Sequence, residues 1–198
     1  MSDSPFSALV KARRSVRRYD TRPVSDEDII AIAEAARLAP SADNVQPWRF
    51  IVVRDSAVRE RLIKEAFSGI NAHSRRLAGA PVFIVICAEK TIMHAAARIA
   101  QGMSYPQIDC GIAGEHLVLA AAERGLGTCW IGLFNRRKTR KLLGIPPRVE
   151  LISLIALGYP EDSLEVRPKG RKLLASILWL DGWARPFAGA GAQDGMEK

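Results

Sequence analysis

The chain has few of the residues on which several common classes of site depend. None of its three histidines lies at metal-ligand spacing from another. Its three cysteines, Cys87, Cys110 and Cys129, lie in apolar stretches, without the spacing of a zinc site or of a disulfide framework. We therefore expect buried free thiols and no bound metal.

Several catalytic motifs are also missing. No GxGxxG follows a strand pattern, and GxxxxGK[ST], HExxH and GxSxG do not occur. His116 lies in an apolar helical stretch, where an interior histidine with a satisfied hydrogen bond is a simpler interpretation than a catalyst. If the protein is an enzyme, we expect a bound cofactor to carry the reaction, and we assign no catalytic residue.

Long hydrophobic runs are absent as well. The first residues lack the apolar core of a signal peptide, and the longest apolar run, within 151–160, is too short to cross a bilayer. We expect a cytoplasmic protein with no membrane partner.

The composition is that of a folded protein with a basic surface. Hydrophobic residues make up 48% and charged residues 25% of the 198 residues, and the net charge is +8. This charge favours anionic ligands such as nucleotides, nucleic acid or acidic membranes. Without an internal repeat or a linker, we expect one domain over 1–185 and a flexible tail over 186–198.

Helix and strand patterns alternate along the chain. Apolar periodicity predicts helices over 4–12, 25–40, 56–67, 109–125 and 136–144, and strands over 48–55, 81–89, 128–134 and 150–160. Ser25 and Ser56 are the expected caps of the second and third helices, and Gly144 closes the fifth. Segment 90–107 has no clear pattern, and 171–183 fits a strand or a helix. The alternation predicts an α+β or α/β fold with a sheet covered by helices.

The helix expected over 109–125 is apolar nearly all round. Such a helix is buried on more than one side. A subunit interface is the simplest position for its second apolar side.

Two basic clusters stand out, RRSVRRYD at 13–20 and RRKTRK at 136–141. In the first, four arginines surround Ser15, and a guanidinium offers a flat fork of donors that matches phosphate oxygens. The same charges also suit a solvated surface or a nucleic-acid patch. The residues alone do not decide between these alternatives.

Two loops have the composition of ligand contacts. In APSADNVQPWRF, 39–50, two prolines enclose Ser41, Asn44 and Gln46, which can hydrogen-bond the edge of a heterocycle. In GLGTCWIG, 125–132, three glycines would let the backbone approach a flat ligand. An ordinary turn between helix and strand remains the alternative for the first loop.

Taken in order, these stretches resemble the nitroreductase family of flavin mononucleotide (FMN) oxidoreductases. The resemblance runs from about residue 8 to residue 183, on RRSVRRYD, PSADNVQPWRF, DCGIAGEHLVLAAAERGLGTCWIG, IPPRVELISLIALGYP and RKLLASILWLDGW. It implies an α+β fold with a mixed central sheet flanked by helices. It also implies an intertwined homodimer with two FMN sites at its interface.

The resemblance further implies which residues bind FMN. The phosphate contacts are Arg13, Arg14 and Ser15, joined by Arg171 and Lys172. Arg17 matches the basic position beside the flavin pyrimidine ring. The partner subunit's loop contributes the positions of Pro40, Ser41, Ala42 and Asn44, with Gln46 in the same motif. The isoalloxazine face is lined by Trp130, Ile131 and Gly132. Near the C-terminus the chain departs from the family pattern, with Leu173 in place of the usual proline and Ser176 in place of an acid.

The activity implied is ping-pong hydride transfer from NADH or NADPH, through flavin N5, to a small-molecule acceptor such as a nitroaromatic or a quinone. Other flavin chemistry on the same fold, such as dehalogenation, enone reduction or flavin fragmentation, remains an alternative. A basic nucleic-acid-binding protein is the alternative outside enzymes, although we expect no nucleic-acid partner.

Overall fold

The structure, a computed structural model, describes residues 4–89, 102–161 and 170–190. The chain divides into two compact units, a core unit of Met1–Asp162 and a C-terminal unit of Ser163–Lys198. Most of the segment 90–107, for which the sequence predicted no clear element, lies outside the described residues. No helix in the described part of the chain is long and apolar enough to span a membrane.

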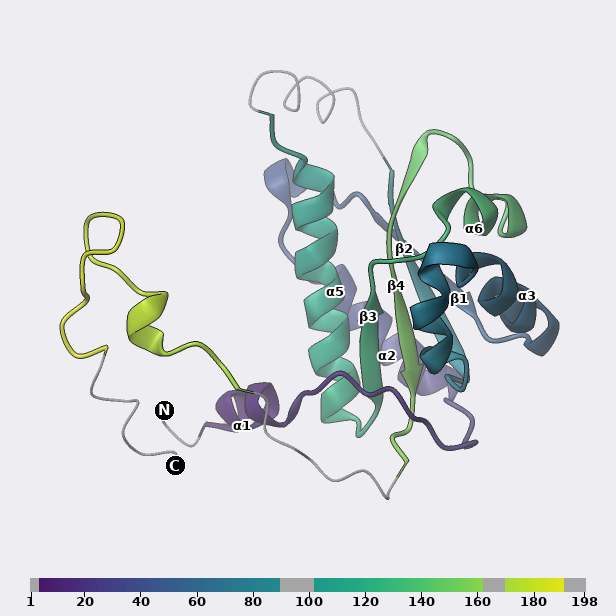
Figure 1. The fold of residues 1–198 in the computed structure, drawn as a ribbon, viewed down its shortest axis with the longest axis horizontal. Helices are drawn as coiled ribbons and strands as arrows, with labels where there is room; N and C mark the ends of the chain where they lie inside the picture. The colour runs from purple at the N-terminus through teal and green to yellow at the C-terminus, as the bar shows by residue number, and fades with distance from the viewer. Residues whose placement is uncertain (1–3, 90–101, 162–169, 191–198) are drawn as a thin grey trace. The chain divides into compact units, whose positions relative to one another are not determined.

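The core unit is built on a four-stranded sheet. Its strands are β1 (Trp48–Val53), β2 (Val82–Glu89), β3 (Gly127–Ile131) and β4 (Val149–Gly158). They lie in the order β1-β2-β4-β3, and each neighbouring pair is antiparallel (Figure 1). Within the described residues, the parallel component of the predicted mixed sheet is a single bridge, between Ser15 and Thr128.

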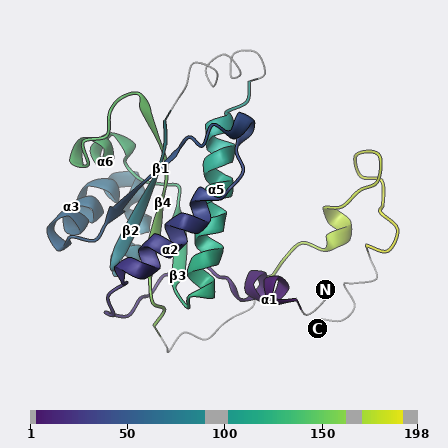
Figure 2. The same cartoon turned by 180° about the vertical axis from the view of Figure 1, so that it is seen from behind.

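Helices cover both faces of the sheet. One face carries α2 (Asp26–Arg37) and α5 (Tyr105–Glu123), and the other carries α3 (Ser56–Ala66) and α6 (Arg136–Leu142) (Figures 1 and 2). The side chains of β2, predicted as a strand over 81–89, alternate between these two layers and are almost fully buried, which is typical of a central strand. The predicted α+β fold is confirmed.

The shorter helices complete the core unit. They are α1 (Pro5–Ala12), η1 (Ala42–Asn44) and η2 (Gly69–Leu77). Figure 1 shows α1 beside the C-terminal end of α5, and η1 lies beside its N-terminal end. The loop that contains η1 thus meets α5 near its N-terminal end, and the basic segment that follows α1 meets it near its middle, at Glu115.

Local chemistry explains most element boundaries. The side chain of Ser25 accepts a hydrogen bond from the Asp28 N–H and caps α2, as predicted. The cap predicted at Ser56 is wrong, because the carboxylate of Asp55, one residue earlier, accepts from the Val58 N–H and caps α3. Helix α5 begins four residues before the predicted start at 109, since Pro106 is tolerated in a first helical turn.

The C-terminal unit contains little regular structure in its described part, 170–190. Its one helical turn is η3 (Leu174–Ser176), and Trp179 forms an isolated bridge with Pro186. The rings of Trp179 and Trp183 lie 4.2 Å apart between centroids. Segment 171–183 is therefore neither the strand nor the α-helix that its pattern allowed.

Candidate functional site

The N-terminal basic segment runs alongside the outer edge of β3. The Val16 N–H donates to the Thr128 carbonyl at 2.8 Å, next to the bridge between Ser15 and Thr128. The side chain of Val16 packs against Gly127, where an added Cβ would lie 2.6 Å from Val16 Cγ2. Gly127 is therefore required for this close approach. The structure thus brings together RRSVR and the glycine-rich GLGTCWIG, which are more than 100 positions apart.

Three of the four clustered arginines, Arg13, Arg14 and Arg17, are partly buried. The Arg13 Nε lies 3.7 Å from a carboxylate oxygen of Glu115 on α5, and Arg14 is half-buried. The Arg17 Nη1 donates to the Ser15 carbonyl at 3.1 Å. Arg18, in contrast, is exposed and paired with a surface glutamate. The cluster is therefore not a uniform solvated face.

Arg17 carries a buried donor without an acceptor. Its Nε is shielded from solvent and has no hydrogen-bond partner among the described residues. A buried donor that stays unsatisfied costs stability, so such atoms in native proteins are commonly completed by a ligand or water. An acceptor group of a bound anion or heterocycle fits this position.

Tyr19 fixes the end of the same segment. Its hydroxyl donates to the Val16 carbonyl at 2.7 Å. Burial, and to a smaller extent Cys129, raise the pKa of Tyr19 well above its ordinary value, against a lowering by Arg17. Tyr19 therefore stays protonated and acts as an anchor rather than as a base.

Loop 40–46 has a constrained backbone. Asp43, Asn44 and Gln46 have positive φ angles of 47°, 55° and 50°. Side-chain bonds hold this conformation, because Ser41 Oγ accepts from the Gln46 N–H at 2.9 Å and the Gln46 amide donates to Asn44 Oδ1 at 2.9 Å. Non-glycine residues rarely adopt such angles, and they gather at binding and catalytic loops. This geometry favours a binding loop over an ordinary turn.

A buried carboxylate attaches this loop to α5. The Ala42 N–H donates to Asp109 Oδ1 at 3.1 Å, and Asp109 is only 2% exposed. Its Oδ2 is buried and has no partner in the described part of the chain. The sequence analysis did not select Asp109, although an acid inside an apolar helix was an available signal. Since the Ala42 N–H is already engaged, Ala42 could contact a ligand only through its other atoms.

The two groups of predicted FMN residues lie against different turns of α5. Loop 40–46 meets α5 at Asp109, and the arginine segment meets it at Glu115. Six residues of helix separate these points by about 9 Å along the axis. That a partner subunit supplies the loop to each site remains a prediction.

The strand residues predicted to line the flavin divide between the faces of the sheet. The Trp130 indole packs on Gly114 in the α2/α5 layer, while Ile131 is buried in the α3/α6 layer. Gly132 and Leu133 follow and are exposed, and Ser74 Oγ donates to the Leu133 carbonyl at 3.0 Å. The strand predicted over 128–134 therefore ends at Ile131, where the chain turns away from β4. Only the backbone of Ile131 could face a ligand together with Gly132.

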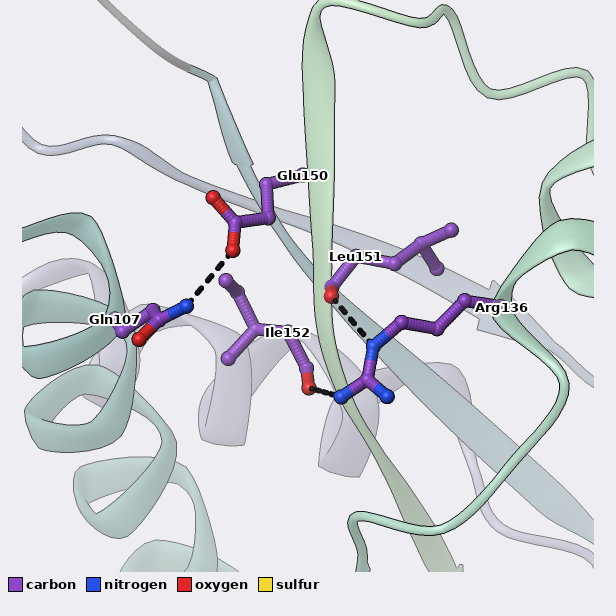
Figure 3. Close-up of a pocket in the computed structure, with 5 residues that line it drawn as sticks. All are labelled: Gln107, Arg136, Glu150, Leu151 and Ile152. Atoms are coloured by element: carbon purple, nitrogen blue, oxygen red, sulfur yellow. Dashed lines mark hydrogen bonds between the residues drawn. The ribbon is translucent and has the colours of Figure 1, made fainter. Parts of the chain in front are cut away.

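A polar cavity of about 370 Å³ lies beyond the end of β3 (Figure 3). The register of β2 and β4 leaves Ile152 unpaired, as in a β-bulge. Arg136 donates to the carbonyls of both Leu151 and Ile152, and Gln107 donates to Glu150 across the cavity. None of the predicted FMN residues lines it. The guanidinium of Arg136 is thus largely used to hold the bulge.

The other basic residues singled out in the sequence lie in the C-terminal unit and in α6. Arg171 and Lys172 belong to the C-terminal unit and are exposed, so their role stays a prediction. In α6, Lys138 pairs with Glu65, and Arg140 donates to the Pro146 carbonyl.

The predictions for His116 and the cysteines are confirmed. The His116 Nδ1 lies 3.3 Å from the Ala35 carbonyl, as expected of a satisfied interior histidine. All three cysteines are buried thiols that take part in no disulfide. No three His, Cys, Asp or Glu side chains gather as a metal site among the residues that the structure describes.

Comparison with known proteins assigns the family. The model of the nitroreductase family matches residues 10–159. The chain belongs to the nitroreductase family. This confirms the resemblance found in the sequence motifs, and membership makes the protein an oxidoreductase that acts on a small-molecule substrate.

Individual relatives in the family agree with this assignment. An Archaeoglobus fulgidus protein, provisionally named NADH dehydrogenase/NAD(P)H nitroreductase, is 40% identical over 162 residues, which cover 78% of this chain and 84% of the relative. The 5,6-dimethylbenzimidazole synthase of Rhodospirillum rubrum is 30% identical, over 79% of this chain and 82% of its own. The crystal structure of a nitroreductase family protein from Clostridium novyi has a TM-score of 0.72 and 30% identity, covering 93% and 97% of the two chains.

Proposed function

We propose that the protein is a homodimeric, FMN-dependent oxidoreductase that takes hydride from NADH or NADPH and reduces a small organic acceptor, such as a nitroaromatic or a quinone. The observation that carries the FMN assignment is the buried, unpartnered Nε of Arg17, held beside β3 next to Arg13 and Arg14. Within the family, this arrangement suits one phosphate and one heterocycle better than an extended nucleic acid.

Different residues would bind different parts of the cofactor. Arg13, Arg14 and Ser15 would bind the phosphate, assisted by Arg171 and Lys172 of the C-terminal unit. The Arg17 guanidinium would face the pyrimidine edge of the ring, and the chain from Trp130 to Gly132 would face its plane. A partner's loop would add Pro40, Ser41, Ala42 and Asn44, with Gln46 holding the loop conformation.

When bound, FMN would supply a two-electron carrier that accepts hydride from the nicotinamide and later reduces the acceptor. Arg17 would contribute a fixed positive charge at the ring edge where negative charge collects on reduction. No side chain is needed as an obligatory acid or base, and Tyr19, anchored to the backbone, does not take that role.

The outer face of α5 supports the homodimer. Helix α5 packs on the sheet and on α2, and Ile112 packs partly against the core between them. On the remaining side lie Ile108, which is 46% exposed, and the partly exposed Leu119, with the exposed Glu115 between them. Phe6 on α1 is 66% exposed, and Trp183 of the C-terminal unit is 84% exposed. A second copy covering Ile108, Leu119 and Phe6 would bury this remaining apolar surface of the core unit, and Trp183 offers the C-terminal unit an apolar contact of its own.

Different flavin chemistry is the second candidate. A relative 30% identical to this chain is named 5,6-dimethylbenzimidazole synthase, a name that matches none of the NAD(P)H reductions above. The nucleic-acid alternative is weaker, because Lys138 and Arg140 of the second basic cluster are engaged within the chain. Strong, salt-dependent DNA binding by the FMN-loaded protein would revive that alternative.

The test begins with the purified protein. We expect a yellow dimer that releases FMN on denaturation, and whose flavin is bleached by NADH or NADPH and reoxidised by quinones or nitroaromatics in stopped-flow mixing. A colourless protein that FMN cannot reconstitute would disprove the cofactor assignment. Flavin that binds but is not reduced by either nucleotide would instead favour the second candidate.

A further inference from the structure

Asp109 is a buried acid that the proposed FMN contacts do not use. It lies in the second turn of α5, among Cys110, Ala113 and Gly114, on the face of the helix that is packed inside the protein. One carboxylate oxygen receives the Ala42 N–H, and the other has no partner among the described residues. Burying a carboxylate with so little compensation costs stability. A residue kept at such a cost commonly serves function rather than folding.

The hydrogen-bond partner of Asp109 belongs to the loop that the sequence singled out. Ala42 begins η1, the turn that places Asp43 and Asn44 in the left-handed region of the backbone. Such a conformation persists only where surrounding contacts determine it. Within the loop, Ser41 bonds to the Gln46 N–H, but that contact does not attach the loop to the rest of the fold. The bond from Ala42 to Asp109 does, because α5 packs on the sheet.

We propose that Asp109 is a positioning residue that holds loop 40–46 in its ligand-binding conformation through the Ala42 N–H, and so sets the affinity for FMN without touching it. The inference rests on the proposed function for its FMN readout. It does not require the negative charge, since an amide oxygen at the same place can accept the same hydrogen bond.

Three variants test the proposal. Asp109→Ala removes the acceptor, and Asp109→Asn keeps an oxygen that can accept from Ala42. Cys110→Ala is the matched control, because Cys110 is the adjacent buried residue and its sulfur bonds to the Cys87 carbonyl rather than to the loop. Each variant is compared with the wild type in urea unfolding of the apo protein.

The first readout needs no cofactor. The endoproteinase Asp-N cuts before aspartate, and Asp43 is exposed in the loop. We expect cleavage before Asp43 in the apo protein to be at least about tenfold faster in Asp109→Ala, and unchanged in Asp109→Asn and Cys110→Ala. Equal cleavage rates in Asp109→Ala and the wild type would overturn the proposal.

The second readout is the FMN dissociation constant, from quenching of flavin fluorescence. We expect an increase of at least about tenfold in Asp109→Ala, and less than about threefold in Asp109→Asn and Cys110→Ala. Asp109→Ala should lose no more apo stability than Cys110→Ala. A loss of affinity in Asp109→Asn equal to that in Asp109→Ala, or one that only follows the loss of apo stability, would overturn the proposal. A wild type that binds no FMN would instead disprove the proposed function, and the proteolysis would still decide the role of Asp109.

Discussion

The indole ring of Trp130 on β3 lies directly against the backbone of Gly114 on α5. A Cβ added at Gly114 would come within 2.7 Å of Trp130 Cζ2 and 3.0 Å of Ile86 Cδ1. Hydrogen in place of a side chain is what allows the helix and the strand to pack at this distance. The same contact fixes the strand next to Gly132, where we place the flavin.

Gly114→Ala should therefore destabilise the protein, even though alanine is the better helix former. Overpacking a close contact of this kind costs about 1–3 kcal/mol, which outweighs the gain in helix propensity. Urea unfolding followed by circular dichroism measures the change. Gly79→Ala is the control, because nothing lies within 4 Å of an added Cβ there and its φ is not positive. If both variants are as stable as the wild type, the contact does not constrain the strand.

Arg13→Ala should weaken FMN binding by about 1.5–3 kcal/mol through loss of a charge-assisted hydrogen bond to the phosphate. Titration of the apo protein with FMN gives the dissociation constant. Arg18→Ala removes the same charge from the same segment, but at an exposed position paired with Glu161. We expect Arg18→Ala to change the affinity little. Equal losses in the two variants would mean that only the overall charge of the segment matters.

Asp28 should make stability depend on pH. Its carboxylate accepts hydrogen bonds from Arg124, Ser25 and Tyr159, which lower its pKa, with Arg124 the largest contribution. A carboxyl with a lowered folded pKa stabilises the protein fully above its unfolded pKa, near 4, and loses that contribution as pH falls through the folded value. Asp28→Asn should be less stable by about 1–2 kcal/mol near neutral pH, and the difference should shrink below about pH 4.

The measurement for Asp28 is urea unfolding between about pH 3 and 7. Asp26→Asn is the control, because Asp26 begins the same helix, is exposed and pairs only at the surface, so its loss should cost about 0.5 kcal/mol or less. A constant difference between Asp28→Asn and the wild type across this pH range would contradict the linkage.

The buried thiols should be unreactive in the native protein. Burial raises the pKa of Cys87 to about 11 and that of Cys110 to about 12, so neither forms appreciable thiolate at pH 8. With Ellman's reagent we expect less than about one equivalent of reactive thiol in the native state, and all three after denaturation. Rapid modification of the native protein would show that the core around α5 opens easily.

Local sequence patterns predicted most of the core unit, because helix periods, strand runs and caps are local properties. The continuous apolar run at 81–89 predicted a buried strand correctly, and Ser25 predicted the start of α2. The failures depended on a neighbour or a distant contact. Asp55, not Ser56, caps α3, because its carboxylate accepts a hydrogen bond from the Val58 N–H. Strand β3 ends at Ile131, where Ser74 holds the following chain by a hydrogen bond to the Leu133 carbonyl.

The candidate site was predictable to a different degree. The motifs identified the arginine segment, the loop and the glycine-rich strand, and the structure joins the first and the third at Thr128. Asp109 could have been noticed as an acid inside an apolar helix, but its partner could not, because a hydrogen bond to a backbone N–H 67 positions away leaves no local pattern. The bulge at Ile152 is equally invisible, since it arises from the register between two strands.

The pairing of Val16 with Thr128 also bears on aggregation. Strand β3 is the last on its side of the sheet, and an uncovered strand edge is a template for pairing with another chain. The Val16 N–H occupies a carbonyl on that edge. The segment that carries the arginines therefore also covers the edge of β3. Variants lacking residues 1–17 should aggregate on storage, as light scattering would show, even where the rest of the sheet stays folded. Colloidal solubility and cofactor retention would then depend on the same short stretch of chain.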